Sequence, residues 1–193
     1  PVDTKKFVLN NKKEEYYVTA GRLEPYKRVD LLVSAFNQIN DKLIIIGSGS
    51  QKKRLMKRAN NNIEFVEYSK PHKVYSIVSR AKAFLHAGIE DFGIAPVEAQ
   101  ACGTPVIAYG DGGALETVIN EKTGILFNDQ TPEAILAAIK RFNQTKFDYS
   151  QIRKNSERFS AENFERNFKR HILNKTKEWQ EKNKEDSQDI LSQ

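Results

Sequence analysis

The chain has 193 residues and a formal net charge of +6, and 39% of its residues are hydrophobic while 29% are charged. This size and composition are typical of a globular protein with one sizeable core, and the basic balance favours anionic partners, although solvated lysine side chains are the simplest source of the charge. No apolar run approaches the roughly 18–20 residues that span a bilayer, the single Cys102 excludes an internal disulfide, and three widely spaced histidines do not form a metal site.

Apolar runs alternate with segments of helical periodicity along most of the chain. The pattern predicts six strands, at residues 16–23, 42–46, 63–66, 83–87, 105–109 and 124–127. It predicts helices after them, at residues 28–39, 51–59, 71–80, 94–101, 114–119 and 132–142, the last with Thr131 as its N-cap. Strands that alternate with helices form a parallel, doubly wound sheet, so we predict a Rossmann-like α/β fold of six strands with extra C-terminal helices.

The remaining segments differ in composition from this core. Residues 1–14 resemble a linker, and the Rossmann-like domain is expected over residues 15–146. Residues 147–182 are predicted to form closing helices with a break near Ser160, and residues 183–193 a polar tail that frays. Because the chain begins with Pro1 rather than Met, we expect it to be part of a longer protein.

Two polar loops are predicted to meet at one edge of the sheet. In the common strand order 3-2-1-4-5-6, the first and fourth strands lie side by side, and ligands bind beyond their carboxyl ends. The first of these strands is followed by Gly21, Arg22 and Lys27, and the fourth by residues 88–93. Two cations beside the start of a helix suit a diphosphate, although the alternative is that both are solvated loop charges.

The second loop carries two carboxylates, Glu90 and Glu98, which we expect to lie on the order of 10 Å apart. That spacing fits opposite ends of an extended ligand such as a nucleotide sugar, because a carboxylate accepts hydrogen bonds from the two hydroxyls of a sugar diol. Between them, Phe92, Gly93 and Ile94 allow close backbone approach and place amides at a helix start. The alternative is that both glutamates are helix-terminal or exposed surface charges.

Three weaker signals accompany these loops. Gly47 opens a Gly-Ser-Gly turn, and we expect either that its backbone approaches a phosphate or ribose or that the glycines only allow the turn. For Tyr68 the two alternatives are contact with a base and packing within its own loop. Gly112 and Gly113 open a further helix, where paired glycines can wrap a phosphate or sugar with their amides. The chain lacks a GxGxxG sequence after its first strand and a Walker A sequence, which argues against a dinucleotide-binding dehydrogenase and a P-loop NTPase.

These residues resemble a known family. Three segments match the carboxyl-terminal, donor-binding domain of retaining glycosyltransferases of family 4 (group 1), which have the GT-B fold: Gly21-Arg22-Leu23 with Lys27, residues 90–99 and residues 101–108. The likeness covers about residues 1–142. Glu90-Asp91-Phe92-Gly93 and residues 112–117 look most like bacterial mannosyltransferases of polysaccharide assembly, which implies GDP-mannose as donor.

The resemblance implies roles for the candidate residues. Arg22 and Lys27 would neutralise the donor diphosphate, Glu98 would hold the ribose hydroxyls, and Glu90 would position the donor sugar near the reacting carbon. The family works without a metal or another cofactor and retains the anomeric configuration. Its members have two Rossmann-like domains, so the domain that holds the glycan or lipid-linked acceptor would be missing here, and the chain alone would transfer little sugar.

Two other functions remain open: a non-catalytic nucleotide-sugar binding module, and a nucleotide-sugar epimerase, for which we find no further acid/base groups around Glu90. Nucleic acid is not expected as a partner, because no basic strand is studded with aromatic residues. We expect a cytoplasmic protein with peripheral association at the inner face of the membrane where the acceptor is lipid-linked.

Overall fold

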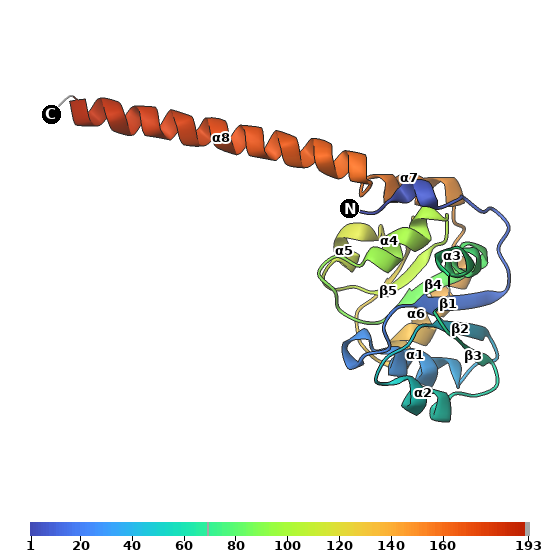
Figure 1. Ribbon diagram of the computed structural model, residues 1–193. Coiled ribbons are helices and arrows are strands. Elements are labelled where there is room, and N and C mark those ends of the chain that lie inside the picture. Colours follow the sequence, from blue (N-terminus) through green and yellow to red (C-terminus); the bar gives the residue numbers. More distant parts are fainter. Residues whose placement is uncertain (69, 192–193) are drawn as a thin grey trace.

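The computed structural model describes residues 1–68 and 70–191, with side chains as far as residue 182. Its six strands form one parallel sheet in the order β3-β2-β1-β4-β5-β6, as predicted (Figure 1). The strands are β1 (Tyr16–Ala20), β2 (Lys42–Ile46), β3 (Ile63–Val66), β4 (Ala83–His86), β5 (Val106–Tyr109) and β6 (Gly124–Phe127). The predicted fold class is therefore confirmed.

Helices cover both faces of this sheet. The helices are α1 (Val29–Phe36), α2 (Lys52–Arg58), α3 (Pro71–Arg80), α4 (Ile94–Ala101), α5 (Ala114–Thr117), α6 (Pro132–Gln144), α7 (Tyr149–Glu157) and α8 (Ala161–Leu191). Two 3₁₀ turns, η1 (Thr4–Lys6) and η2 (Pro25–Lys27), precede β1 and α1. Helices α1, α2 and α6 pack on one face, while α3, α4 and α5 pack on the other (Figure 1).

Each strand divides its apolar side chains between the two faces, because successive side chains of a strand point in opposite directions. In β2, Leu43 and Ile45 join the core under α1 and α6, while Ile44 and Ile46 join the core under α3 and α4. This double burial explains why the strands are continuous apolar runs rather than alternating ones.

Some predicted boundaries of the strands and helices are wrong. The first strand ends at Ala20 rather than at residue 23, because the chain turns and Leu23 N–H donates to the carbonyl of Ser48 at 2.8 Å. The helix predicted from residue 28 begins at Val29, because Arg28 has a left-handed backbone (φ 50°, ψ 35°) that no α-helix accepts. The Thr131 N-cap is confirmed by the 3.2 Å bond from Ala134 N–H to its hydroxyl.

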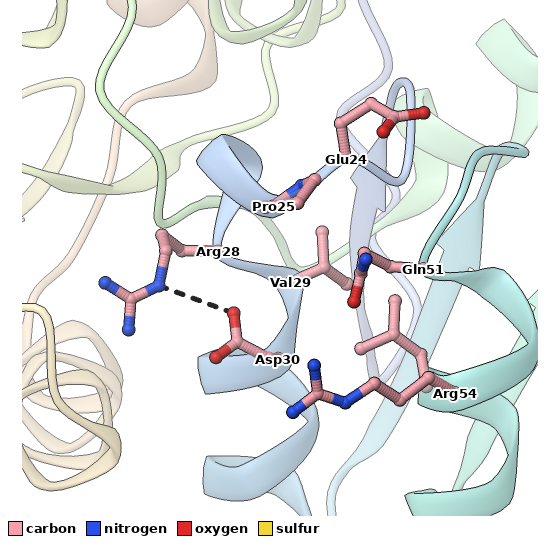
Figure 2. Close-up of a pocket in the computed structure, with 8 residues that line it drawn as sticks. Glu24, Pro25, Arg28, Val29, Asp30, Gln51 and Arg54 are labelled. Atoms are coloured by element: carbon pink, nitrogen blue, oxygen red, sulfur yellow. Dashed lines mark hydrogen bonds and ion pairs between the residues drawn. The ribbon is translucent and has the colours of Figure 1, made fainter.

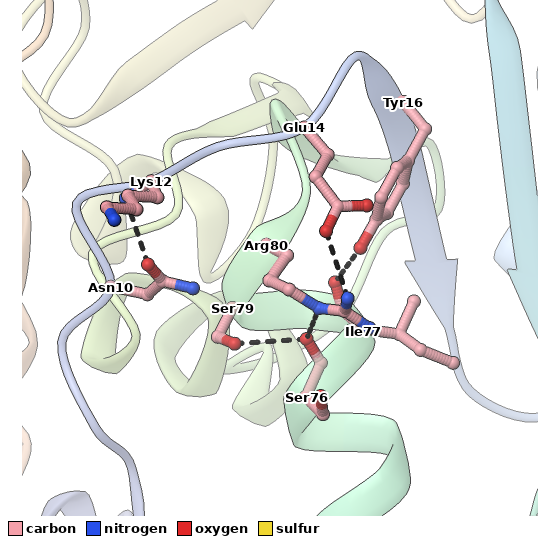
Figure 3. A network of polar contacts seen from close by, with 8 residues as sticks. All are labelled: Asn10, Lys12, Glu14, Tyr16, Ser76, Ile77, Ser79 and Arg80. Carbon is pink, nitrogen blue, oxygen red and sulfur yellow. Dashed lines mark hydrogen bonds and ion pairs between the residues drawn. The ribbon is translucent and has the colours of Figure 1, made fainter.

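Residues 1–14 lie against the body of the domain. The Arg153 guanidinium of α7 donates to the carbonyls of Thr4 (2.8 Å) and Phe7 (2.7 Å). Close to β1, Glu14 pairs with Arg80 at 2.9 Å and Tyr16 donates to the Ile77 carbonyl at 2.7 Å (Figure 3).

The closing helices break at Ser160, whose hydroxyl accepts from Asn163 N–H at 3.2 Å. Helix α8, predicted to end at residue 182, continues to Leu191, and the expected fraying of the tail stays a prediction; residues 192–193 lie outside the described residues. The reason is local, because this stretch has no glycine or proline. Within the described part of the chain, no helix is both long enough and apolar enough to cross a membrane.

Candidate functional site

The loops after β1 and β4 form opposite walls of one cavity of about 610 Å³. These two strands are hydrogen-bonded neighbours, and the winding of the sheet reverses between them. Eight of the ten predicted site residues line the cavity: Gly21, Arg22, Lys27, Glu90, Phe92, Gly93, Ile94 and Glu98. Tertiary structure thus brings together the two loops that the sequence singled out.

A cation and a carboxylate face each other across this cavity. Lys27 Nζ forms an ion pair with Glu90 Oε1, and the two side chains are only 22% and 19% exposed. Burial first, and the charge of Arg22 second, lower the pKa of Lys27. The pair joins the loop after β1 to the loop after β4, and an anion that binds Lys27 must compete with Glu90.

Arg22 and Tyr26 complete the first wall. Arg22 is exposed and donates to the Tyr26 hydroxyl at 3.1 Å, while the Lys27 ammonium lies 5.2 Å from the centre of the Tyr26 ring. The tyrosine therefore contacts both cations through a cation–π interaction and a hydrogen bond. Sequence reasoning missed Tyr26, although an aromatic residue between two selected cations is a usable signal.

Glu98 lies on the second wall, in the middle of α4. Desolvation by burial raises its pKa, and the Lys6 charge opposes this shift. Gly93 precedes α4 with a φ of 81°, a left-handed conformation that favours glycine. This conformation lets the chain turn sharply from Phe92 into the helix, so that the first residues of α4, Ile94 and Ala95, line the cavity.

Gly47 and Tyr68 are not among the residues that line the cavity. A Cβ atom on Gly47 would lie 1.9 Å from the carbonyl oxygen of Gly21, so a glycine here permits the close approach of the loops after β1 and β2. Tyr68 follows β3 and is 61% exposed. Their predicted contacts with a nucleotide stay predictions.

The paired glycines after β5, Gly112 and Gly113, pack against the backbone of the loop that carries Glu90. Gly113 N–H donates to the Glu90 carbonyl at 2.7 Å, and Gly112 N–H donates to Asp111 Oδ1 at 2.6 Å. A Cβ on Gly113 would lie 2.5 Å from the backbone of Phe92. Both amides are already engaged within the protein, so the expectation that they wrap a phosphate or sugar is not met; these glycines shape the loop of Glu90.

His86, which the sequence analysis did not select, lies at the base of the site. It ends β4 beside a small cavity of about 20 Å³ that Lys27 and Glu90 also line. Burial, and to a smaller extent the Lys27 charge, lower the pKa of His86 to about 4, so the imidazole is neutral at pH 7. Among the side chains that the structure describes, no group of three His, Cys, Asp or Glu residues is arranged to hold a metal ion.

The sheet order and the crevice at its switch point define a Rossmann-like domain. The structure superposes on the lipopolysaccharide outer core galactosyltransferase WaaB with a TM-score of 0.80 at 21% identity, over 91% of this chain and 54% of that one. It also matches the C-terminal domain of a group 1 glycosyl transferase from Francisella tularensis, with a TM-score of 0.64 at 18% identity over 81% and 92% of the two chains. These likenesses show the fold.

The family follows from the sequence match. Residues 2–159 match the family described as glycosyl transferases group 1, and the chain belongs to this family. A curated relative is the GDP-mannose-dependent alpha-(1-6)-phosphatidylinositol monomannoside mannosyltransferase of Mycolicibacterium smegmatis, 30% identical over 140 residues, which cover 63% of this chain and 37% of the relative. The chain spans about a third to two fifths of the length of such relatives.

Proposed function

We propose that this chain is the donor-binding domain of a retaining glycosyltransferase, which transfers a hexose from a nucleotide sugar to a glycan or glycolipid acceptor. One observation carries the proposal: two cations, Arg22 and Lys27, face two carboxylates, Glu90 and Glu98, across one cavity. A nucleotide sugar has the matching charge pattern, because its diphosphate is anionic and its two sugars present hydroxyls on either side.

In the proposed complex, Lys27 and Arg22 bind the diphosphate. Glu98 accepts hydrogen bonds from the ribose hydroxyls, and Glu90 accepts them from the donor sugar. Backbone amides around Phe92 and Ile94 complete the clamp at the start of α4.

The proposed chemistry breaks the bond between the anomeric carbon and the diphosphate oxygen. The acceptor hydroxyl oxygen forms the new bond on the same face of the sugar, and its proton passes to the departing diphosphate oxygen. The negative charge that develops on the leaving nucleoside diphosphate is stabilised by Arg22 and Lys27 rather than by a metal ion.

Mannose from GDP-mannose is the proposed donor. Its support is the name of the Mycolicibacterium smegmatis relative, together with the resemblance of residues 90–93 and 112–117 to mannosyltransferases. The name of that relative also specifies a phosphatidylinositol monomannoside, which supports a lipid-linked acceptor and peripheral association with the inner face of the membrane.

The acceptor site is assigned to a second Rossmann-like domain. An apolar cavity of about 410 Å³ supports this assignment, since Phe92, Phe159, Phe164 and Phe168 line it at the start of α8. Phe164 and Phe168 are 48% and 56% exposed, which is unfavourable in water and favours a further packing partner. The chain alone is therefore expected to bind the donor and to transfer little or no sugar.

A non-catalytic nucleotide-sugar binding module is the second candidate. The observation that favours it is the cavity with its two cations and two carboxylates, which suits binding of a nucleotide sugar without transfer. Sugar transfer by the complete encoded protein excludes this candidate.

Calorimetric titration with GDP, GDP-mannose, UDP and UDP-glucose, without metal, tests the proposal. We expect one base to bind at least tenfold more tightly than the other, and an Arg22→Ala, Lys27→Ala double variant to lose this binding. Absence of binding at millimolar concentration by both this chain and the complete protein refutes the donor site.

A further inference from the structure

Arg28 has a backbone conformation that its residue type disfavours. It lies between η2 and α1 with a φ of 50° and a ψ of 35°, the left-handed region that favours glycine. A non-glycine residue there is uncommon, and such strain often accompanies a functional constraint. The position directly follows Lys27, so this turn determines where Lys27 enters the cavity.

The side chain of Arg28 links the two walls of the site. Its Nε donates to Asp30 Oδ1 at 3.4 Å, as Figure 2 shows, and its Nη1 donates to Gln130 Oε1 at 3.3 Å. The Gln130 amide in turn donates to the carbonyl of Ala87 at 2.8 Å. Ala87 follows β4 and leads into the loop of Glu90, so a chain of hydrogen bonds runs from one wall to the other.

The backbones of the loop of Lys27 and the loop of Glu90 are in direct contact at Gly88, where no side chain would fit. A Cβ on Gly88 would lie 2.6 Å from the Tyr26 carbonyl oxygen and 2.9 Å from Lys27 Cα. Arg28 and Gln130 add a second point of attachment beyond this contact. Neither residue lines the donor cavity; Arg28 lines a neighbouring one of about 340 Å³, shared with Arg54 of α2 (Figure 2).

We propose that Arg28 and Gln130 are positioning residues that hold the loop of Lys27 against the loop of Glu90, and so set the spacing between this cation and this carboxylate for a nucleoside diphosphate. The inference rests on the proposed function. It differs from a purely local role, in which Arg28 only completes the turn and any residue that accepts a left-handed backbone serves equally well.

The substitution Arg28→Gly separates these two roles, because glycine keeps the turn and relieves its strain while removing the guanidinium. We expect Arg28→Gly and Gln130→Ala each to weaken binding of GDP or UDP, whichever binds the unsubstituted chain, by about three- to tenfold. The freed loop carries Lys27 away from the diphosphate, and this loss outweighs the relief from the charge of Glu90. The affinity of the double variant for the nucleotide is expected to lie within twofold of that of the single variant that binds more weakly, because the two residues act through one connection. Arg54→Ala, which removes the same charge from the neighbouring cavity, is the matched control and is expected to change affinity less than twofold.

A titration of the Lys27 side chain by NMR tests the positioning without any nucleotide. Both variants are expected to lower the pKa of Lys27 relative to the unsubstituted chain, since its carboxylate partner moves away, whereas Arg54→Ala leaves it unchanged. Unchanged nucleotide affinity in Arg28→Gly, or an unchanged Lys27 titration in both variants, overturns the inference. If neither the unsubstituted chain nor the complete protein binds either nucleotide, the proposed function fails, and the Lys27 titration alone decides the inference.

Discussion

The ion pair between Lys27 and Glu90 predicts that removal of a charged side chain from the site increases its affinity for a nucleoside diphosphate. In the structure the Glu90 carboxylate pairs with the Lys27 ammonium, which is proposed to bind the diphosphate, and both side chains are about four-fifths buried. The substitution Glu90→Gln keeps the size of the side chain and removes its charge. We therefore expect the variant to bind a nucleoside diphosphate more tightly than the unsubstituted chain does, because the ligand no longer competes for Lys27 and no longer meets a nearby negative charge.

The burial of the pair sets the magnitude. An exposed ion pair contributes about 0–1 kcal/mol, and breaking a fully buried one costs about 3–5 kcal/mol. With 22% and 19% exposure, the Lys27–Glu90 pair lies between these limits, at about 1–2 kcal/mol. Converted at about 1.4 kcal/mol per tenfold, Glu90→Gln tightens binding by about 5- to 30-fold.

The assay is calorimetric titration of both proteins with a nucleoside diphosphate and with the corresponding nucleotide sugar. The nucleotide sugar is expected to gain less affinity than the diphosphate, because its hydroxyls lose a charged acceptor at residue 90. Glu64→Gln is the matched control, since Glu64 pairs with Lys42 on the surface at 2.8 Å, and it is expected to change affinity less than twofold.

Weaker or equal binding of the diphosphate by Glu90→Gln refutes the reasoning. That result means that Glu90 supports the phosphate site instead of competing with it. A circular dichroism melt that matches the unsubstituted chain confirms that the variant is folded.

Further predictions concern the other residues of the site and its support. Glu98→Ala is expected to weaken nucleotide binding by about 1–3 kcal/mol, because a ribose loses its acceptor; unchanged affinity for the nucleoside diphosphate contradicts the assignment. Arg22→Ala is expected to weaken the diphosphate much more than the nucleoside in parallel titrations, and equal losses indicate damage to the structure. The pKa of His86 is about 4 in the folded chain and near 6.5 in the unfolded one, so the unfolded chain binds more protons between these values and stability falls as pH falls through this window. His86→Gln is expected to remove about 2–3 kcal/mol of the stability loss between pH 7 and pH 4.5, measured by urea unfolding, and an unaltered pH dependence rejects this origin. Gly47→Ala is expected to destabilise the chain by more than about 2 kcal/mol in the same assay, since its Cβ would lie 1.9 Å from the Gly21 carbonyl oxygen; native stability contradicts the packing role given to this glycine.

The pattern of the chain alone was sufficient to predict the sheet and to predict that the two polar loops meet at one edge of it. Apolar strands that alternate with amphipathic helices leave few topologies, because parallel crossovers are right-handed and sequential elements tend to be neighbours. The strand order then places Arg22 and Lys27 opposite Glu90, although more than sixty residues separate them in the sequence. Motif and topology were therefore independent routes to the same cavity.

Only the tertiary structure decided what individual residues do in these loops. Gly113 has the local sequence of a phosphate-binding turn, yet its N–H donates to the Glu90 carbonyl, and Gly47 permits the close approach of the Gly21 backbone. The left-handed turn at Arg28 and its hydrogen bond to Gln130 could not be predicted from the spacing of apolar residues. Periodicity reports which face of an element is buried, whereas these roles depend on contacts between loops far apart in the chain, which exist only after the strands have brought their carboxyl ends together.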